Sequence, residues 1–249
     1  MTPSLTPHIE ALTRFAESYL REGDEDGIRL KLAHSLRVLD NASSIIEGEG
    51  IQGHDAWLCR MCALYHDIGR FPQFAQFQTF NDRKSFNHGR MGVLTLRQEG
   101  FPIPVDSADG RIIRFTVGQH NLKVIRGGMK PSLDRPVRVV RDADKLDIYN
   151  VMLANFEGDA FDPIIVQSLP NEPENYTNQI YKAVLTGNAV DYTQLRVAND
   201  FLLLLLGWLK RFNFDTSLRI AHDRHYPSRI FKLLPNTPEM RTLHSQIYK

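Results

Sequence analysis

Apolar residues recur at the three- and four-residue spacing of α-helices along most of the chain. The segment from Ile28 to Ile46 is apolar on two nearly opposite sides, which is typical of a central helix in an all-helical packing. The spacing predicts further helices over residues 6–20, 55–67, 71–77, 88–99, 135–149, 180–185 and 191–212. At residues 113–120 a strand is the alternative, because Ile, Phe, Thr and Val are strand-prone. Together these patterns predict an all-α fold.

The longest apolar run covers residues 201–209. A helix that crosses a bilayer needs about 20 apolar residues, so this run is too short to do so. It is flanked by Asp200 on one side and by Lys210 and Arg211 on the other. We therefore expect a buried helix here, and no contact with a membrane.

Length and charge limit the organisation and the partners of the chain. A length of 249 residues is at the top of the range for one domain, so we expect a single domain over residues 1–249. The chain has 30 Lys and Arg residues against 29 Asp and Glu residues, a net charge of +1. Bulk charge therefore does not indicate nucleic-acid binding. No sequence feature predicts the oligomeric state.

The two cysteines, Cys59 and Cys62, lie one turn apart within an apolar helical segment. Their spacing is found in zinc and redox sites, but no second pair completes a zinc site. We interpret them as buried thiols. Few cysteines and no recognisable signal peptide lead us to expect a cytoplasmic location.

The main chemical feature is the doublet His66–Asp67, which ends the apolar segment. Adjacent residues of a helix lie about 100° apart, so an imidazole and a carboxylate can reach one metal ion from a single turn. Gly69 follows, and glycine accepts the left-handed conformation in which helices commonly end. The alternative is a surface pair at a frayed helix end.

Other candidate ligands lie at helix ends or on apolar faces. His34 shares an apolar stripe with Val38, where a lone histidine is more often a core residue than a ligand. Asp142 shares a face with Leu146, a placement that is costly unless the carboxylate is paired or bound to a metal. The candidate metal ligands are His34, His66, Asp67, His88, His120 and Asp142. Such a set suits iron, manganese, zinc or nickel, and it is large enough for two ions that share a carboxylate.

The ordered pattern His…His-Asp…Asp resembles the HD-domain superfamily of metal-dependent phosphohydrolases. His34, the doublet and Asp142 match its four defining residues, and His88 and His120 stand where a subset of the superfamily binds a second metal. The similarity covers roughly residues 28–150. It implies an HD-type helical bundle over about 28–150 with additional C-terminal helices over about 151–249. The sequence lacks the Gly-Tyr-Pro extension of cyclic-di-GMP phosphodiesterases and the Glu-Asp pair of guanosine-tetraphosphate hydrolases, which counts against those two substrates.

The resemblance implies hydrolysis of a phosphomonoester or phosphodiester by metal-activated water, with Asp67 shared by two ions. The expected cofactor is one or two divalent ions: iron, manganese, nickel, cobalt or zinc, with magnesium as a further option. A nucleotide or another small phosphorylated metabolite is the expected substrate. Arg70 and Lys145 are the candidates for phosphate binding, and Arg37 is a weaker one. Asp144 and Asp147 are candidates to orient ligands from behind.

Three alternatives remain at this point. The same ligands occur on similar scaffolds that hold two irons and activate oxygen, as in myo-inositol oxygenase-like enzymes. A nucleotide-binding sensor with a structural metal is a non-enzymatic alternative. The cluster from His222 to His225 is either a second metal site or a set of surface salt bridges.

Overall fold

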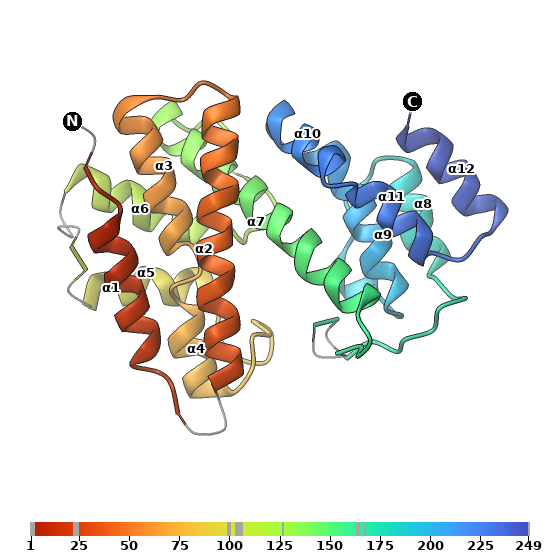
Figure 1. The fold of residues 1–249 in the computed structure, drawn as a ribbon, viewed down its shortest axis with the longest axis horizontal. Coiled ribbons are helices and arrows are strands. Elements are labelled where there is room, and N and C mark those ends of the chain that lie inside the picture. The colour runs from red at the N-terminus through yellow and green to blue at the C-terminus, as the bar shows by residue number, and fades with distance from the viewer. Residues whose placement is uncertain are drawn as a thin grey trace. The chain divides into compact units, whose positions relative to one another are not determined.

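The computed structural model describes residues 3–21, 25–98, 101–102, 107–125, 127–162, 165–166 and 168–248. The regular structure in these ranges is helical, with no strand among them (Figure 1). The predicted all-α fold is therefore confirmed, and residues 113–119 are helical rather than extended. The chain divides into two compact units, Met1–Asp147 and Ile148–Lys249. The single-domain organisation stays a prediction.

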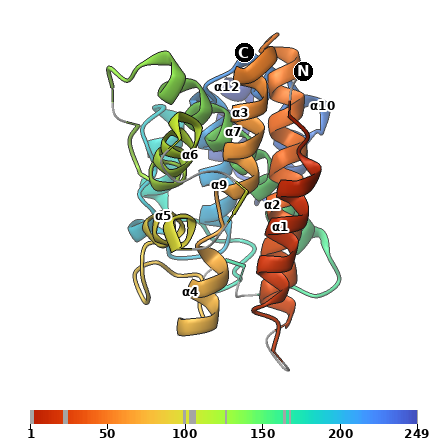
Figure 2. The same cartoon turned by 90° about the vertical axis from the view of Figure 1, so that its left-hand side faces the viewer.

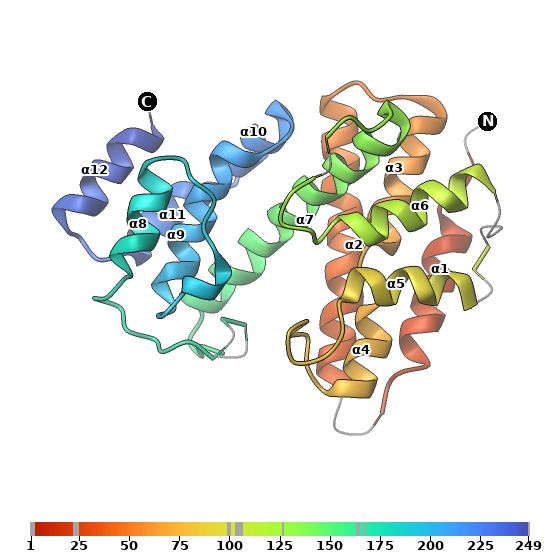
Figure 3. The same cartoon turned by 180° about the vertical axis from the view of Figure 1, so that it is seen from behind.

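The first unit contains six helices within its described residues, and the first part of a seventh. They are α1 (Thr6–Glu17), α2 (Glu25–Gly48), α3 (Gly53–Tyr65), α4 (Arg70–Phe77), α5 (His88–Gln98), α6 (Ala108–Gln119) and α7 (Pro131–Glu157). Figure 2 shows α1, α2 and α3 running side by side. Figure 3, from the opposite side to Figure 1, shows α5 and α6 crossing in front of them.

Helix α3 is the centre of this unit. Every residue from Ala56 to Tyr65 except Arg60 is buried, because α1, α2 and α6 all pack against it. Helix α2 buries most of the apolar positions of its two stripes, although Leu30 is 42% exposed. The sequence of α3 is thus apolar on nearly all sides, and its C-terminal end carries the polar doublet into the interior.

Helix α7 begins earlier than its sequence pattern indicated. Pro131 stands at its first position, where a missing N–H leaves no hydrogen bond unmade, and Pro136 lies inside the first turns. In the first unit α7 packs against α2, where the side-chain amide of Asn41 donates a hydrogen bond to the carbonyl of Ala143 at 3.1 Å. This contact fixes which face of α7 meets α2.

Gly69 is required by a close approach of two backbones. Its φ is −68°, so it does not adopt the left-handed conformation expected from the sequence. A Cβ atom at this position would lie 2.2 Å from the carbonyl oxygen of His88 and 2.4 Å from the amide nitrogen of Gly92. The turn after α3 therefore rests directly on the backbone of α5, and this contact brings His88 to the doublet.

The second unit contains the end of α7 and five further α-helices among its described residues. They are α8 (Asn178–Leu185), α9 (Asn199–Trp208), α10 (Asp215–Asp223), α11 (Tyr226–Leu233) and α12 (Pro238–Ile247), with short 3₁₀ turns η1 (Tyr192–Gln194) and η2 (Leu209–Arg211). The leucine run lies in α9 and is buried, as expected. No described helix combines the length and the apolar character that crossing a membrane requires.

The helix predicted over residues 191–212 is wrong in its length. The carboxylate of Asp200 accepts hydrogen bonds from the backbone amides of Thr177, Arg196 and Val197. These bonds hold the preceding segment in a non-helical path, so α9 begins only at Asn199. At the other end η2 replaces the last α-helical turn.

Gly69→Ala should destabilise the first unit by about 1–3 kcal/mol, since the added methyl group overlaps the backbone of α5. Urea denaturation followed by circular dichroism would measure the change. Gly127→Ala is the control: a Cβ there meets nothing within 4 Å, so its effect should stay within about 0.5 kcal/mol. Equal denaturation midpoints for both variants and the natural protein would contradict the close approach.

Candidate metal centre

Four buried imidazoles converge in the first unit. The Nε2 atoms of His34 and His66 are 3.3 Å apart, and those of His88 and His120 are 3.1 Å apart. Their backbones come from α2, from the residue that ends α3, from the start of α5 and from the residue that ends α6. Residues from four separate elements, spread over much of the first unit's sequence, therefore place the same ring atom in one small region.

Asp67 lies between the two histidine pairs. Its Oδ2 atom is 3.5 Å from the Nε2 atom of His34, and its Oδ1 atom is 3.4 Å from that of His88 and 3.6 Å from that of His120. Each oxygen of this one carboxylate therefore faces a different pair. This is the arrangement expected of a carboxylate shared by two ions.

The second carboxylate of the cluster belongs to Asp144. Its Oδ1 atom is 3.3 Å from the Nε2 atom of His34 and 3.9 Å from that of His66. Potential ligand atoms of His34, His66 and Asp144 all lie within 4.8 Å of one another, and the same holds for His66, Asp67 and His120.

Asp142, predicted from the sequence as a ligand, is not part of either group. It is fully buried and contacts the ammonium of Lys145 at 3.4 Å. The two acids are two positions apart, so they point to sides of α7 about 200° apart. The sequence argument that Asp142 faces an apolar interior holds, but pairing with Lys145 compensates its burial there. The carboxylate placed beside the histidines is Asp144.

Each histidine has its other ring nitrogen engaged. The Nδ1 atoms of His66 and His120 donate to the backbone carbonyls of Ala63 at 2.8 Å and Val117 at 2.7 Å. Because a carbonyl only accepts, these two rings carry the proton on Nδ1, and their Nε2 atoms present lone pairs when the rings are neutral. The tautomer is thus assigned by the hydrogen-bond partner.

The other two histidines are backed by carboxylates. The Nδ1 atom of His34 contacts Oδ2 of Asp147 at 2.6 Å, and Asp147 is held in turn by Arg37 at 2.6 Å. The Nδ1 atom of His88 contacts Oδ2 of Asp82 at 2.8 Å. Carboxylate backing of this kind orients a metal-binding imidazole and raises its basicity. Each half of the cluster therefore has one carboxylate-backed and one carbonyl-backed histidine.

The electrostatics favour neutral rings at His66 and His88, the charged ring at His34, and ionised carboxylates. Burial lowers the pKa of His66 to about 4 and that of His88 to about 4. Burial would raise the pKa of Asp67, but the nearby Lys31 and Arg70 hold it well below its usual range. Burial also opposes the charged form of His34, yet hydrogen bonds to Asp144 and Asp147 raise its pKa. The neutral rings of His66 and His88 and the ionised carboxylate of Asp67 therefore face one another, an arrangement that a divalent cation stabilises.

The donor set therefore fits a transition metal. His34, His66, Asp67 and Asp144 would form one set of ligands, and His88, His120 and Asp67 a second set. Imidazole nitrogens with carboxylate oxygens suit zinc, iron, manganese, cobalt and nickel better than calcium.

The two predicted phosphate-binding cations, Arg70 and Lys145, have different partners in the structure. Arg70 donates from Nη1 to the backbone carbonyl of Phe80 at 2.6 Å and to Asp82 at 3.1 Å, and its Nε atom lies 3.4 Å from Asp67. Lys145 pairs with Asp142, so it lies beside the acid that is outside the cluster. Arg70 borders the centre, but its guanidinium is committed to the loop that follows α4.

Sequence reasoning missed two residues of this site. Asp82 lies in a loop that the pattern marked only as polar, and no spacing connects it to His88. Lys31 contacts Asp67 at 3.0 Å from α2, one turn before His34, and that i, i+3 spacing was a usable signal. Asp144 and Asp147, proposed as orienting acids, do lie at His34 as a pair one turn apart.

The remaining candidates lie elsewhere. Cys59 and Cys62 are free and buried, as interpreted from the sequence, and burial raises the pKa of Cys59 to about 12. The segment from His222 to His225 ends α10 and precedes α11. Among the described residues, the groups of three close ligand atoms do not include it.

Asp82→Ala should weaken binding of one metal ion by about 10- to 100-fold, because His88 loses the carboxylate that orients it. Titration of the metal-free protein with Mn²⁺ or Co²⁺, followed by calorimetry, would measure this. Asp40→Ala removes an exposed acid of α2 and should leave both affinities unchanged. An Asp82→Ala protein that binds metal like the natural one would show that this carboxylate does not support the site.

Asp144→Asn and Asp142→Asn should have opposite effects. Asp144→Asn should lose at least one bound ion with little change in stability. Asp142→Asn should keep its metal but unfold more easily, by about 1–3 kcal/mol, since it weakens a buried pair with Lys145. Elemental analysis and urea denaturation of both proteins would test this. The reverse result would return the ligand role to Asp142.

Comparison with known protein families gives one match. Residues 32–149 match the family model described as HD domain. Neither the curated proteins nor the solved structures contain a match to this chain. The matched range includes every residue of the cluster except Lys31, which lies one position before it.

Proposed function

Because residues 32–149 are an HD domain, we propose that this chain is a metal-dependent phosphohydrolase that binds two ions. Members of this family are generally metal-dependent hydrolases of phosphoesters, although some members are not catalytic. The observation that carries the proposal is the position of Asp67, with one oxygen toward each histidine pair. A purely structural site would need neither a shared carboxylate nor a second pair of histidines.

The residues of the site have distinct roles in this proposal. We assign His34, His66, Asp67 and Asp144 to the first ion, and His88, His120 and Asp67 to the second. Asp147 and Asp82 hold two of the imidazoles in the productive tautomer. Arg70 stabilises the ionised form of Asp67 and ties the loop of Asp82 to the site. Bound ions would supply a water whose pKa is lowered from 15.7 to about 7.

The exposure of the site limits how a substrate enters. The imidazole rings and Asp67 are at most 7% exposed in their side chains, whereas Asp144 is 23% exposed. Asp144 is thus the most exposed of the residues assigned to the ions, and we propose that the phosphoryl group of the substrate enters on its side. Attack of the water oxygen on phosphorus, in line with the leaving oxygen, breaks the ester bond between phosphorus and that oxygen, which takes up a proton from the water. A monoester gives phosphate and an alcohol, and a diester gives a phosphomonoester and an alcohol. Nucleotides and small phosphorylated metabolites fit this description.

Metal analysis and a panel of substrates together test the proposal. The purified protein should contain a transition metal by elemental analysis, and the metal-free protein should regain phosphoesterase activity with one or more of Mn²⁺, Co²⁺, Ni²⁺ and Fe²⁺. A panel of nucleoside monophosphates, dinucleotides and sugar phosphates would reveal the substrate. Asp67→Ala should lose both metal and activity, down to the level of the chelated protein.

Two results would replace this function by the alternatives. Consumption of oxygen by a protein that requires an iron pair would indicate oxygenase chemistry on the same ligands. Absence of turnover on the whole panel with both ions bound, together with nucleotide binding, would indicate a sensor. Reduced metal content in Asp67→Ala is expected under each of these, so only the turnover result separates them.

A further inference from the structure

The cation Lys31 faces the proposed centre from α2. Its ammonium lies 3.0 Å from Oδ2 of Asp67, the same oxygen that faces His34. It also lies 5.2 Å from the ring centroid of Phe80, within the range of a cation–π contact. The side chain is 17% exposed, so its position is neither deep in the core nor free in solvent.

The other cations near the centre, Arg37 and Arg70, form hydrogen bonds with other partners. Arg37 forms two hydrogen bonds with Asp147, at 2.6 Å and 3.0 Å. Arg70 donates to Gln73, Phe80 and Asp82 from a single nitrogen. Arg70 also lies 3.4 Å from Oδ1 of Asp67 through Nε, but its other hydrogen bonds hold the guanidinium in the loop after α4. Lys31 differs, because its ammonium donates its hydrogen bond to a carboxylate oxygen assigned to a metal ion.

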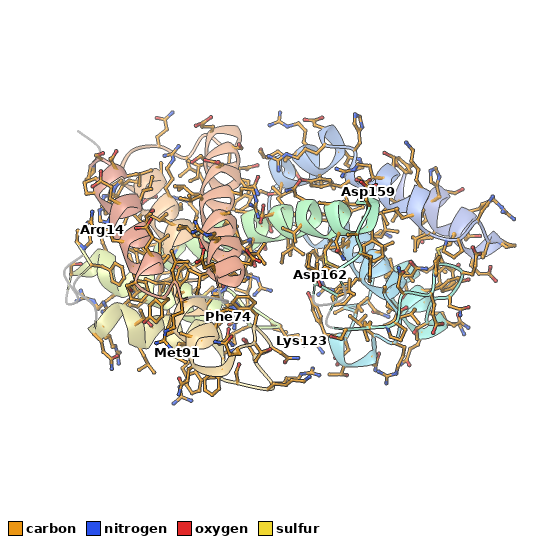
Figure 4. All side chains as sticks on the ribbon, turned by 60° about the horizontal axis from the view of Figure 1, so that its bottom comes forward. Arg14, Phe74, Met91, Lys123, Asp159 and Asp162 are labelled. Carbon is orange, nitrogen blue, oxygen red and sulfur yellow. The ribbon has the colours of Figure 1, made fainter. Side chains whose placement is uncertain are left out.

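An ammonium and a divalent ion compete for that oxygen. A metal–oxygen distance is about 2.0–2.2 Å, so an ammonium kept at hydrogen-bond distance from the same oxygen would be close to the ion and repelled by it. Lysine has a flexible four-carbon stem, so its ammonium can withdraw without movement of α2. The ring of Phe80 restricts the positions open to the ammonium. This ring is stacked on that of Phe74, with centroids 4.7 Å apart and ring planes at 17° (Phe74 is labelled in Figure 4).

We propose that Lys31 binds the phosphate of the substrate: its ammonium neutralises Asp67 in the metal-free protein and pairs with phosphoryl oxygens once a metal ion holds that carboxylate. This inference rests on the proposed phosphohydrolase function and deepens it. Lys31 replaces Lys145 as the lysine for this role, because Lys145 is paired with Asp142. A dianionic phosphate gains more from the added positive charge than a monoanionic diester does, so phosphomonoesters are the favoured substrate class.

Binding of inorganic phosphate to the Mn²⁺-loaded protein tests the assignment without turnover. Lys31→Met should weaken phosphate binding about tenfold or more in calorimetry, while Mn²⁺ affinity stays equal or increases, since a competitor for Asp67 has been removed. Lys31→Arg should retain most of the phosphate affinity. Arg29→Met removes a cation of the same helix that pairs with Glu25 on the surface, and it should bind phosphate like the natural protein.

The outcomes separate this inference from the proposed function. Phosphate affinity that is unchanged in Lys31→Met, or lost equally in Arg29→Met, overturns the role of Lys31 even if the protein hydrolyses phosphoesters. Reduced Mn²⁺ affinity in Lys31→Met also overturns it, because that is the effect of a merely structural contact. Loss of phosphate binding in a protein that turns over no phosphoester supports Lys31 and overturns the hydrolase. Should Lys31→Met fail to fold, Lys31→Gln gives the same comparison.

Discussion

The arrangement of this site depends on where four imidazoles keep their protons. Each Nδ1 atom is held by a carbonyl or a carboxylate, so each Nε2 atom presents a lone pair when its ring is neutral. The Nε2 atoms are 3.1–3.3 Å apart within each pair, and the ionised carboxylate of Asp67 lies between the pairs. Such a cluster is unfavourable by itself in a buried place. The surrounding packing must therefore hold these groups together. A bound cation would attract the ring nitrogens and the carboxylate and so stabilise the cluster.

The packing that does so differs between the two halves. The half containing His34 and Asp144 is held by two long helices, α2 and α7, through the hydrogen bonds of Arg37 and Asn41. The half containing His88 depends on the loop between α4 and α5, where Asp82 accepts from Arg70 and from Gln73 at 2.9 Å. Helix pairs hold side chains more rigidly than loops do. The arrangement of the first half is thus fixed by two packed helices, whereas that of the second half depends on the path of one loop.

Periodicity predicted the features that local rules determine and failed where a distant contact decides. The buried helix before the doublet, the long helix α2 and five of the six candidate residues were predictable, because apolar spacing and ligand chemistry are both visible along the chain. The glycine after the doublet was predicted for the wrong reason: it is required by the backbone of α5, which no local pattern reveals. Asp82 was not predictable either, because its relation to His88 is set by the path of a loop.

The structure places Asp144 rather than Asp142 beside the histidines, which shows why the carboxylate of such a cluster is hard to choose from sequence. Both acids lie on α7, and the more deeply buried of the two is the one outside the cluster. Burial identifies a carboxylate whose negative charge must be compensated, but a neighbouring lysine can do this just as a metal ion can. The distinguishing feature is the second acid one turn away: Asp147 backs the same histidine that Asp144 faces. On a helix that passes a metal centre, a pair of acids on one face is therefore better evidence for a ligand than a single acid on an apolar face.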